Sequence, residues 1–164
     1  MTEDPLGGRA DEATVLVGFL DWYRAIAARK VEGMTTELAT RVMTPSGLSP
    51  LGIVAHLAWA ERRWFRGRFA GDPGVHPMVD NEESFRLAPG DTVESVLAAY
   101  ATEVEHSRRV VAAAPSLDDV GVEPAPHVGE FSLRWVLVHM LEETARHAGH
   151  LDLMCEQLDG RVGD

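Results

Sequence analysis

The chain has 164 residues, of which 45% are hydrophobic and 25% are charged. This is ordinary globular composition, and it excludes wholesale disorder, collagen and a disulfide scaffold. The 15 basic and 26 acidic side chains give a net charge of −11, which disfavours a nucleic-acid or anionic-membrane partner because such partners need clustered Lys and Arg.

The length is that of one typical domain, so residues 1–164 are expected to form a single domain. The chain has one cysteine, Cys155, which can form no intrachain disulfide and indicates a reducing compartment. The N-terminal segment is acidic and lacks the basic and apolar regions of a signal peptide, and no apolar run approaches the ~20 residues that span a bilayer. We therefore expect a soluble cytoplasmic protein.

The first two helices are predicted over residues 11–30 and 50–68. In the first, apolar residues recur at spacings of three and four and make one stripe: Leu16, Phe19, Leu20, Tyr23, Ile26 and Ala27. The second begins with Ser49 as N-cap and Pro50 at the first helical position, and Gly71 follows its end.

Two further helices are predicted over residues 92–114 and 133–158. Asp91 with Glu94 fits a capping arrangement for the third helix, and Pro115 ends it. Ser132 caps the fourth helix and Gly160 terminates it. No segment has a convincing strand pattern, and residues 71–90 and 115–130 form long connections that are typical of functional loops or short extra helices. The expected fold is an all-α four-helix bundle with long connecting loops.

The last helix carries an unusual polar stripe. Because each helical residue advances by ~100°, His139, Glu143, His147 and His150 fall within about a quarter-turn of one another. The flanking residues on that side are apolar or aromatic: Trp135, Val136, Met140, Leu151 and Met154. The stripe is therefore expected to face the interior of the bundle.

The second helix shows the same pattern around His56, which shares its side with Ile53, Trp59, Ala60 and Trp64. A single inward histidine is more often a core residue whose hydrogen bonds are satisfied. Here two helices point imidazoles and a carboxylate inwards, and leaving such groups unpaired costs on the order of several kcal/mol each.

A divalent metal satisfies these groups together. Imidazole nitrogens and a carboxylate oxygen suit Zn²⁺ and also Ni, Fe or Mn. Glu143 and His147, at i and i+4, lie one above the other on one helix face, and His56 supplies a third ligand from across the bundle. Three protein ligands leave an open position for water or substrate, which favours catalysis over a structural role.

Two stretches resemble a known family. The sequence SPLGIVAHLAWAERRWF, from Ser49 to Phe65, resembles the second helix of the DinB/YfiT-like superfamily, and LRWVLVHMLEETARHAGHLD, from Leu133 to Asp152, resembles its last helix. The E-T-A-R-H-x-G-H signature is similar to that of an actinobacterial subfamily. The resemblance implies a four-helix bundle whose metal is held by three side chains.

The resemblance also implies roles for individual residues. Many members carry H-x-x-x-H in the last helix, whereas this chain has Glu143 in place of the first His; the mycothiol-dependent maleylpyruvate isomerases similarly use a His, Glu, His set. The implied ligands are thus His56, Glu143 and His147, with His150 as a neighbouring proton shuttle. The isomerases carry a further domain for which this chain has no room, so isomerase activity is not expected.

Three functions remain open at this point. The first is a zinc-dependent transferase that joins a small thiol, mycothiol or bacillithiol, to an electrophile. The second is a metal-dependent hydrolase, and the third a non-catalytic metal-binding bundle or dimer module; a homodimer is plausible by analogy with the family. His127, in a Pro-rich loop, either closes over the site or is exposed without a role, and His76 and His106 are expected at the surface.

Overall fold

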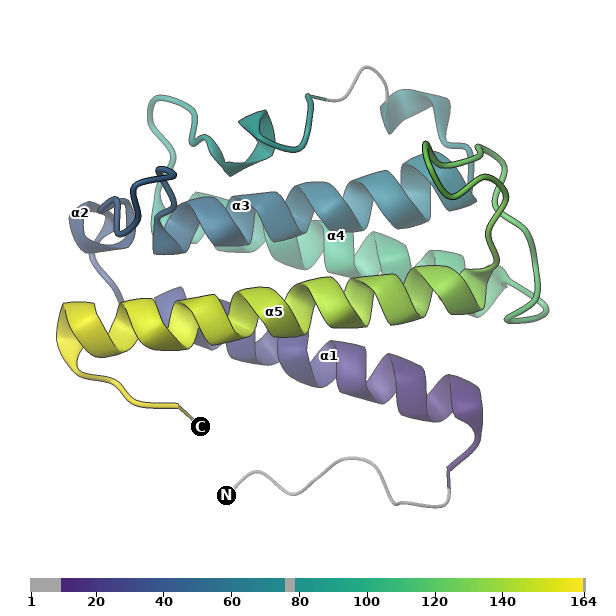
Figure 1. Cartoon of the computed structure of the whole chain (residues 1–164), viewed down its shortest axis with the longest axis horizontal. Coiled ribbons are helices and arrows are strands. Elements are labelled where there is room, and N and C mark those ends of the chain that lie inside the picture. Colours follow the sequence, from purple (N-terminus) through teal and green to yellow (C-terminus); the bar gives the residue numbers. More distant parts are fainter. Residues whose placement is uncertain (1–9, 76–78, 164) are drawn as a thin grey trace.

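The computed structural model describes residues 10–75 and 79–163 of the chain. Its α-helices are α1 (Glu12–Val31), α2 (Thr36–Ala39), α3 (Pro50–Glu61), α4 (Val93–Ala113) and α5 (Leu133–Asp159). The four long helices α1, α3, α4 and α5 lie side by side (Figure 1), with α1 packed along α5 and α3 along α4. Within the described ranges no strand forms, and only two isolated β-bridges occur in the segment before α5. The predicted all-α bundle is confirmed.

Local capping explains where the long helices begin and end. The side chains of Ser49 and Ser132 accept hydrogen bonds from backbone amides of the first turns of α3 and α5, as predicted. Gly160 ends α5 in the left-handed conformation, with φ of 77°.

The predicted cap of α4 was wrong by one residue. Thr92, not Asp91, is the N-cap: the Thr92 hydroxyl accepts from the Ser95 amide, and the Ser95 hydroxyl accepts from the Thr92 amide. The Asp91 carboxylate instead accepts from the amide of Ala88 and closes the preceding turn. Ser, like Glu or Gln, can return the hydrogen bond to the cap, so the reciprocal pattern arises one residue later than expected.

The second predicted helix reaches its expected length but changes type. After Glu61 the chain continues as a π-helix, η1 (Arg62–Phe69), and the Ala70 amide donates to the carbonyl of Phe65, five residues back. Such π segments are rare and often occur at functional sites. The arginines and aromatic residues of η1 therefore do not follow the α-helical spacing assumed from the sequence.

The connection after η1 lies across α3. It contains two short 3₁₀ helices, η2 (Pro73–Val75) and η3 (Glu83–Phe85), and Figure 1 shows it passing along the outer side of α3. Gly52 permits the close approach, because a Cβ there would stand 2.6 Å from the carbonyl oxygen of Phe85. The loop thus places Ser84 and Phe85 directly on α3.

The core consists of two apolar clusters. One is built around Leu51, Leu57 and Leu151, and the other around Leu20, Phe65 and Met140. On α5, Glu143 and His147 fall between the residues of the two clusters, as Arg24 does on α1. No helix within the described ranges is both long and apolar enough to cross a membrane.

Candidate metal centre

Three side chains from two helices meet between the apolar clusters. The Nε2 atom of His56 on α3 lies 3.0 Å from Oε1 of Glu143 on α5, and Nε2 of His147 lies 3.3 Å from the same oxygen. The three donor atoms all lie within 4.8 Å of one another. His56 is 1% exposed and His147 5% exposed, so the cluster is nearly closed off from water.

The hydrogen bonding of Ser84 determines which nitrogen of His56 carries the proton. The Ser84 hydroxyl donates its single proton to the carbonyl of Asn81, at 2.6 Å. It can therefore only accept from His56, whose Nδ1 lies 2.7 Å away and must carry a hydrogen. In the neutral ring Nε2 is then an unprotonated acceptor that points at Glu143.

Aromatic rings hold the histidines in place. The ring of Phe85 stacks on His56 with a centroid distance of 3.9 Å and an interplanar angle of 8°, and it also contacts His147 at 5.7 Å. Trp59, one turn after His56 on α3, lies 5.5 Å from the His56 ring at 25°. This packing limits rotation of the imidazoles, which pre-organises the donor atoms.

The surroundings favour a neutral imidazole beside an ionised carboxylate. Burial lowers the pKa of His56 below its ordinary value. The imidazole of His147, which lies 3.3 Å from the carboxylate and can donate to it, holds the pKa of Glu143 well below the usual range. The other oxygen of Glu143, Oε2, faces the half-exposed guanidinium of Arg146 at 3.4 Å.

This donor set fits a divalent cation. The carboxylate oxygen and the His56 Nε2 atom are both acceptors, and two acceptors 3.0 Å apart repel unless a positive charge lies between them. Two imidazole nitrogens and one carboxylate oxygen are ligands that Zn²⁺ and related metals accept, and three protein ligands leave a position open. Ser84 corresponds to the hydrogen-bond partner that metal-binding histidines generally have on their second nitrogen.

The remaining residues of the stripe on α5 lie on either side of this cluster. His150 is one turn further along, and its Nδ1 lies 3.4 Å from Nδ1 of His147. His139 lies one turn before Glu143, stacked on Trp135 at 4.9 Å and edge-on to Trp64 at 4.6 Å. Neither residue is among the three whose donor atoms meet.

The other histidines and the cysteine lie elsewhere in the chain. His127 is exposed, with a positive φ of 68°, and His106 is half-buried on α4. His76 lies outside the described residues, as does the acidic N-terminal segment. Cys155 is buried, and its thiol donates to the carbonyl of Lys30.

Sequence reasoning missed two features of this region. Ser84 and Phe85 are 28 and 29 positions from His56 in a loop without periodicity, so no pattern connects them to it. It also missed the fully buried Glu61, whose two carboxylate oxygens accept from Nε and Nη2 of Arg24 at 2.7 and 2.6 Å. A carboxylate that directly follows the apolar run from Leu57 to Ala60 was the available signal for that ion pair.

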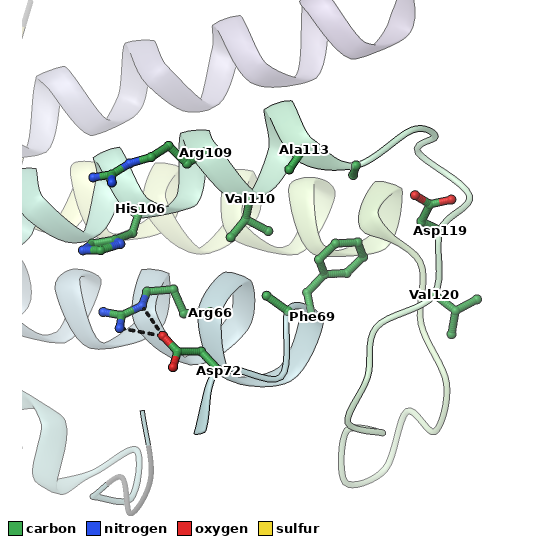
Figure 2. A pocket seen from close by; sticks show the side chains of 11 residues that line it. Arg66, Phe69, Asp72, His106, Arg109, Val110, Ala113, Asp119 and Val120 are labelled. Atoms are coloured by element: carbon green, nitrogen blue, oxygen red, sulfur yellow. Dashed lines mark hydrogen bonds and ion pairs between the residues drawn. The ribbon is translucent and has the colours of Figure 1, made fainter. Parts of the chain in front are cut away.

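A cavity on the surface of the bundle lies away from the cluster. It has a volume of about 650 Å³ between α4, η1 and the loop before α5 (Figure 2), and its lining includes none of the three donor residues. Arg66, on its wall, is paired with Asp72 at 2.7 Å and with Glu103 at 3.2 Å. This cavity therefore offers no unpaired charge at Arg66 and no connection to the candidate centre.

Comparison with known proteins places the chain in a family. A comparison with curated proteins gives no match. A family model described as mycothiol-S-transferase matches residues 15–160, which include all four long helices apart from the first turn of α1 and all three donor residues. The chain therefore belongs to the mycothiol-S-transferase family, which is part of the DinB/YfiT-like superfamily.

Proposed function

We propose that the protein is a metal-dependent transferase that joins mycothiol to small electrophiles, with His56, Glu143 and His147 as the ligands of a divalent cation, zinc by the chemistry of the donors. The observation that carries the proposal is the unprotonated Nε2 of His56 facing the Glu143 carboxylate at 3.0 Å. A cation is the simplest partner for both groups. Membership of the mycothiol-S-transferase family supports mycothiol as the thiol.

When bound, the cation lowers the pKa of a thiol in its open position, so that the thiolate forms near neutral pH. The residues of the chain then have separate tasks. Ser84 keeps the proton of His56 on Nδ1, which directs Nε2 inwards. Glu143 contributes a negative charge that partly neutralises the cation, and Phe85 keeps bulk water from the His56 ring.

His150 is placed to move the proton released by the thiol. With His147 bound through Nε2, its Nδ1 carries a hydrogen that points at Nδ1 of His150, 3.4 Å away. His150 is half-buried and so connects this pair with the solvent. In the transfer itself the thiolate sulfur forms a bond to an electrophilic carbon, and a leaving group departs with the bonding electrons.

The test combines metal content with thiol consumption. We expect about one divalent ion per chain by elemental analysis of the wild type and a loss of at least tenfold in His147→Ala, because two ligands hold a metal far more weakly than three. The His106→Ala variant is the control, since His106 is a half-buried histidine of α4 outside the three donor residues. Near-zero metal in both wild type and His147→Ala after purification with added metal would refute the site.

The reaction is tested separately with a panel of electrophiles, mycothiol or bacillithiol, and a chelator. We expect mycothiol to be consumed with the electrophile, and the activity to be lost on chelation. Turnover without any thiol would assign a hydrolase instead, and metal binding without turnover would assign a non-catalytic bundle. A homodimer and a reducing, cytoplasmic location stay predictions.

A further inference from the structure

The π-helix η1 carries an unusual set of unpaired cations. It contains Arg62, Arg63, Arg66 and Arg68, and Arg66 forms ion pairs with Asp72 and Glu103. Among the residues that the structure describes, no carboxylate pairs with the other three arginines. In a chain with a net charge of −11, such a local excess of unpaired positive charge is unexpected.

Two of these arginines lie on tryptophan rings that lead to the candidate metal centre. The guanidinium of Arg63 lies 4.9 Å from the ring centroid of Trp59, which is itself 5.5 Å from the ring of His56. The guanidinium of Arg68 lies 5.8 Å from the centroid of Trp64. Each of these arginines therefore places a cation on an aromatic ring, and the ring of Trp59 adjoins a proposed metal ligand.

The ring of Trp64 also contacts aromatic residues of α5. The ring of Trp64 lies 5.1 Å from that of Trp135 and 4.6 Å from that of His139, one turn before Glu143. We name Trp59, Arg63, Trp64, Arg68 and Trp135 the arginine–tryptophan strip. All five side chains are half-buried, so they are partly desolvated and still reachable by a ligand.

Within residues 10–75 and 79–163, no carboxylate offsets the mutual repulsion of the guanidinium groups of Arg63 and Arg68. Burial, followed by the charge of Arg68, lowers the pKa of Arg63. Arg68 donates only to a neutral carbonyl, that of Pro124, and its Nε is buried without a hydrogen-bond partner. A bound anion would relieve the repulsion between the two guanidinium groups.

We propose that the arginine–tryptophan strip binds the electrophilic substrate and selects planar aromatic or conjugated molecules that carry a carboxylate. This inference rests on the proposed transferase function. A flat ring stacks on Trp59 or Trp64, and a carboxylate accepts two parallel hydrogen bonds from a guanidinium. The strip then holds the anionic end of the substrate away from the centre and directs the electrophilic carbon towards the sulfur.

Binding is tested without turnover. The probes are 4-methylbenzoate and its neutral analogue 4-methylbenzamide, titrated into the metal-loaded protein while tryptophan fluorescence is followed. We expect the wild type to bind the carboxylate at least about tenfold more tightly than the amide, as a charged hydrogen-bond pair provides. The preference is expected to fall below twofold in Arg63→Gln/Arg68→Gln and to persist in Arg109→Gln, which removes an exposed arginine of α4.

Equal binding of the two probes by the wild type, no measurable binding of the carboxylate, or a preference that persists in the double variant would overturn the proposal. Because these titrations need neither thiol nor reaction, their failure is distinct from failure of the transferase. A protein that transfers mycothiol but shows no preference retains the proposed function and loses only the assignment of the strip.

Kinetics then identify which substrate the strip contacts. The electrophiles are 4-(chloromethyl)benzoate and 4-(chloromethyl)benzamide; a C–S bond forms, the C–Cl bond breaks, chloride leaves and the thiol proton passes to solvent. In the double variant we expect the KM for the benzoate to rise about tenfold, with the KM for mycothiol and the kcat for the amide unchanged. A higher KM for mycothiol, or equal losses for both electrophiles, would contradict the proposal.

Discussion

Two carboxylates in the interior of this bundle, the fully buried Glu61 and the partly buried Glu143, are balanced in different ways. Glu61 is fully buried and receives both hydrogen bonds of a bidentate arginine pair from Arg24. Burial opposes the charge of Arg24, but the Glu61 carboxylate outweighs it and raises the pKa of the guanidinium. Glu143 faces two imidazoles instead, and its one guanidinium partner, Arg146, is half-exposed.

The difference separates a structural charge pair from a binding site. Around Glu61 the protein supplies its own cation, so every charge is neutralised by the fold itself. Around Glu143 the protein supplies acceptors, and the proton of His56 is held on the opposite side of the ring by Ser84. A site that requires an external cation is thus recognisable because its acceptors lack a buried cationic side chain of the protein as a partner.

The largest change in the free energy of unfolding is expected from breaking the ion pair between Arg24 and Glu61. Glu61→Gln leaves the buried charge of Arg24 without its partner, which costs about 3–5 kcal/mol in the free energy of unfolding. Denaturant unfolding measures the loss. In the control Asp21→Asn, which removes the more exposed partner of the same guanidinium, we expect a loss below about 1 kcal/mol. A stability within 1 kcal/mol of wild type for Glu61→Gln would contradict this interpretation of the pair.

The next effect concerns the residue that orients His56. Ser84→Ala frees Nδ1, so the ring can place its proton on Nε2 and cease to be a ligand; we expect metal affinity to fall about 10–100-fold. Competition with a chromophoric chelator measures the affinity. Ser107→Ala is the control, because Ser107 is equally buried on α4 and bonds only to the carbonyl of Glu103. Equal affinities in all three proteins would rule out a role for Ser84.

Acid should release the metal in a defined pH range. Burial lowers the pKa of His56 from the ordinary 6.5, so the ring stays neutral at pH 6.5 and competition by protons begins only below that value. Below the pKa of His56, affinity should fall by at least about tenfold per pH unit, because a proton must leave this ring before it can bind the metal. Metal content after dialysis at pH 8 to 5 measures this. Release centred above pH 6.5 would mean that His56 is not a buried neutral ligand.

The smallest effect is expected when the substitution made at Glu61 is repeated at Glu143. It tests directly whether the two carboxylates differ in how they are neutralised. In metal-free protein we expect Glu143→Gln to change the free energy of unfolding by less than about 1 kcal/mol, because the amide can donate to the bare Nε2 of His56. Denaturant unfolding in the presence of chelator measures it. A loss as large as that in Glu61→Gln would show that the protein itself neutralises Glu143.

Much of the architecture was predictable because helices are specified locally. The apolar stripes and the Ser49, Ser132 and Gly160 signals depend on residues within a turn or two, so helix positions followed from the sequence. The i, i+4 spacing likewise places Glu143 and His147 on one face of α5 wherever that helix packs. The inward direction of His56 followed from its apolar neighbours on α3.

Long-range packing decided the remainder. The contact of Ser84 and Phe85 with His56 spans 28 residues or more and depends on a loop seated against Gly52. The pairing of Arg24 with Glu61 spans 37 residues, and no local pattern links the two. The sequence by itself therefore determined the helices and the inward position of the donor residues. Only the tertiary structure decided which proton His56 carries and which carboxylate has a protein cation, because those properties depend on neighbours that are distant along the chain.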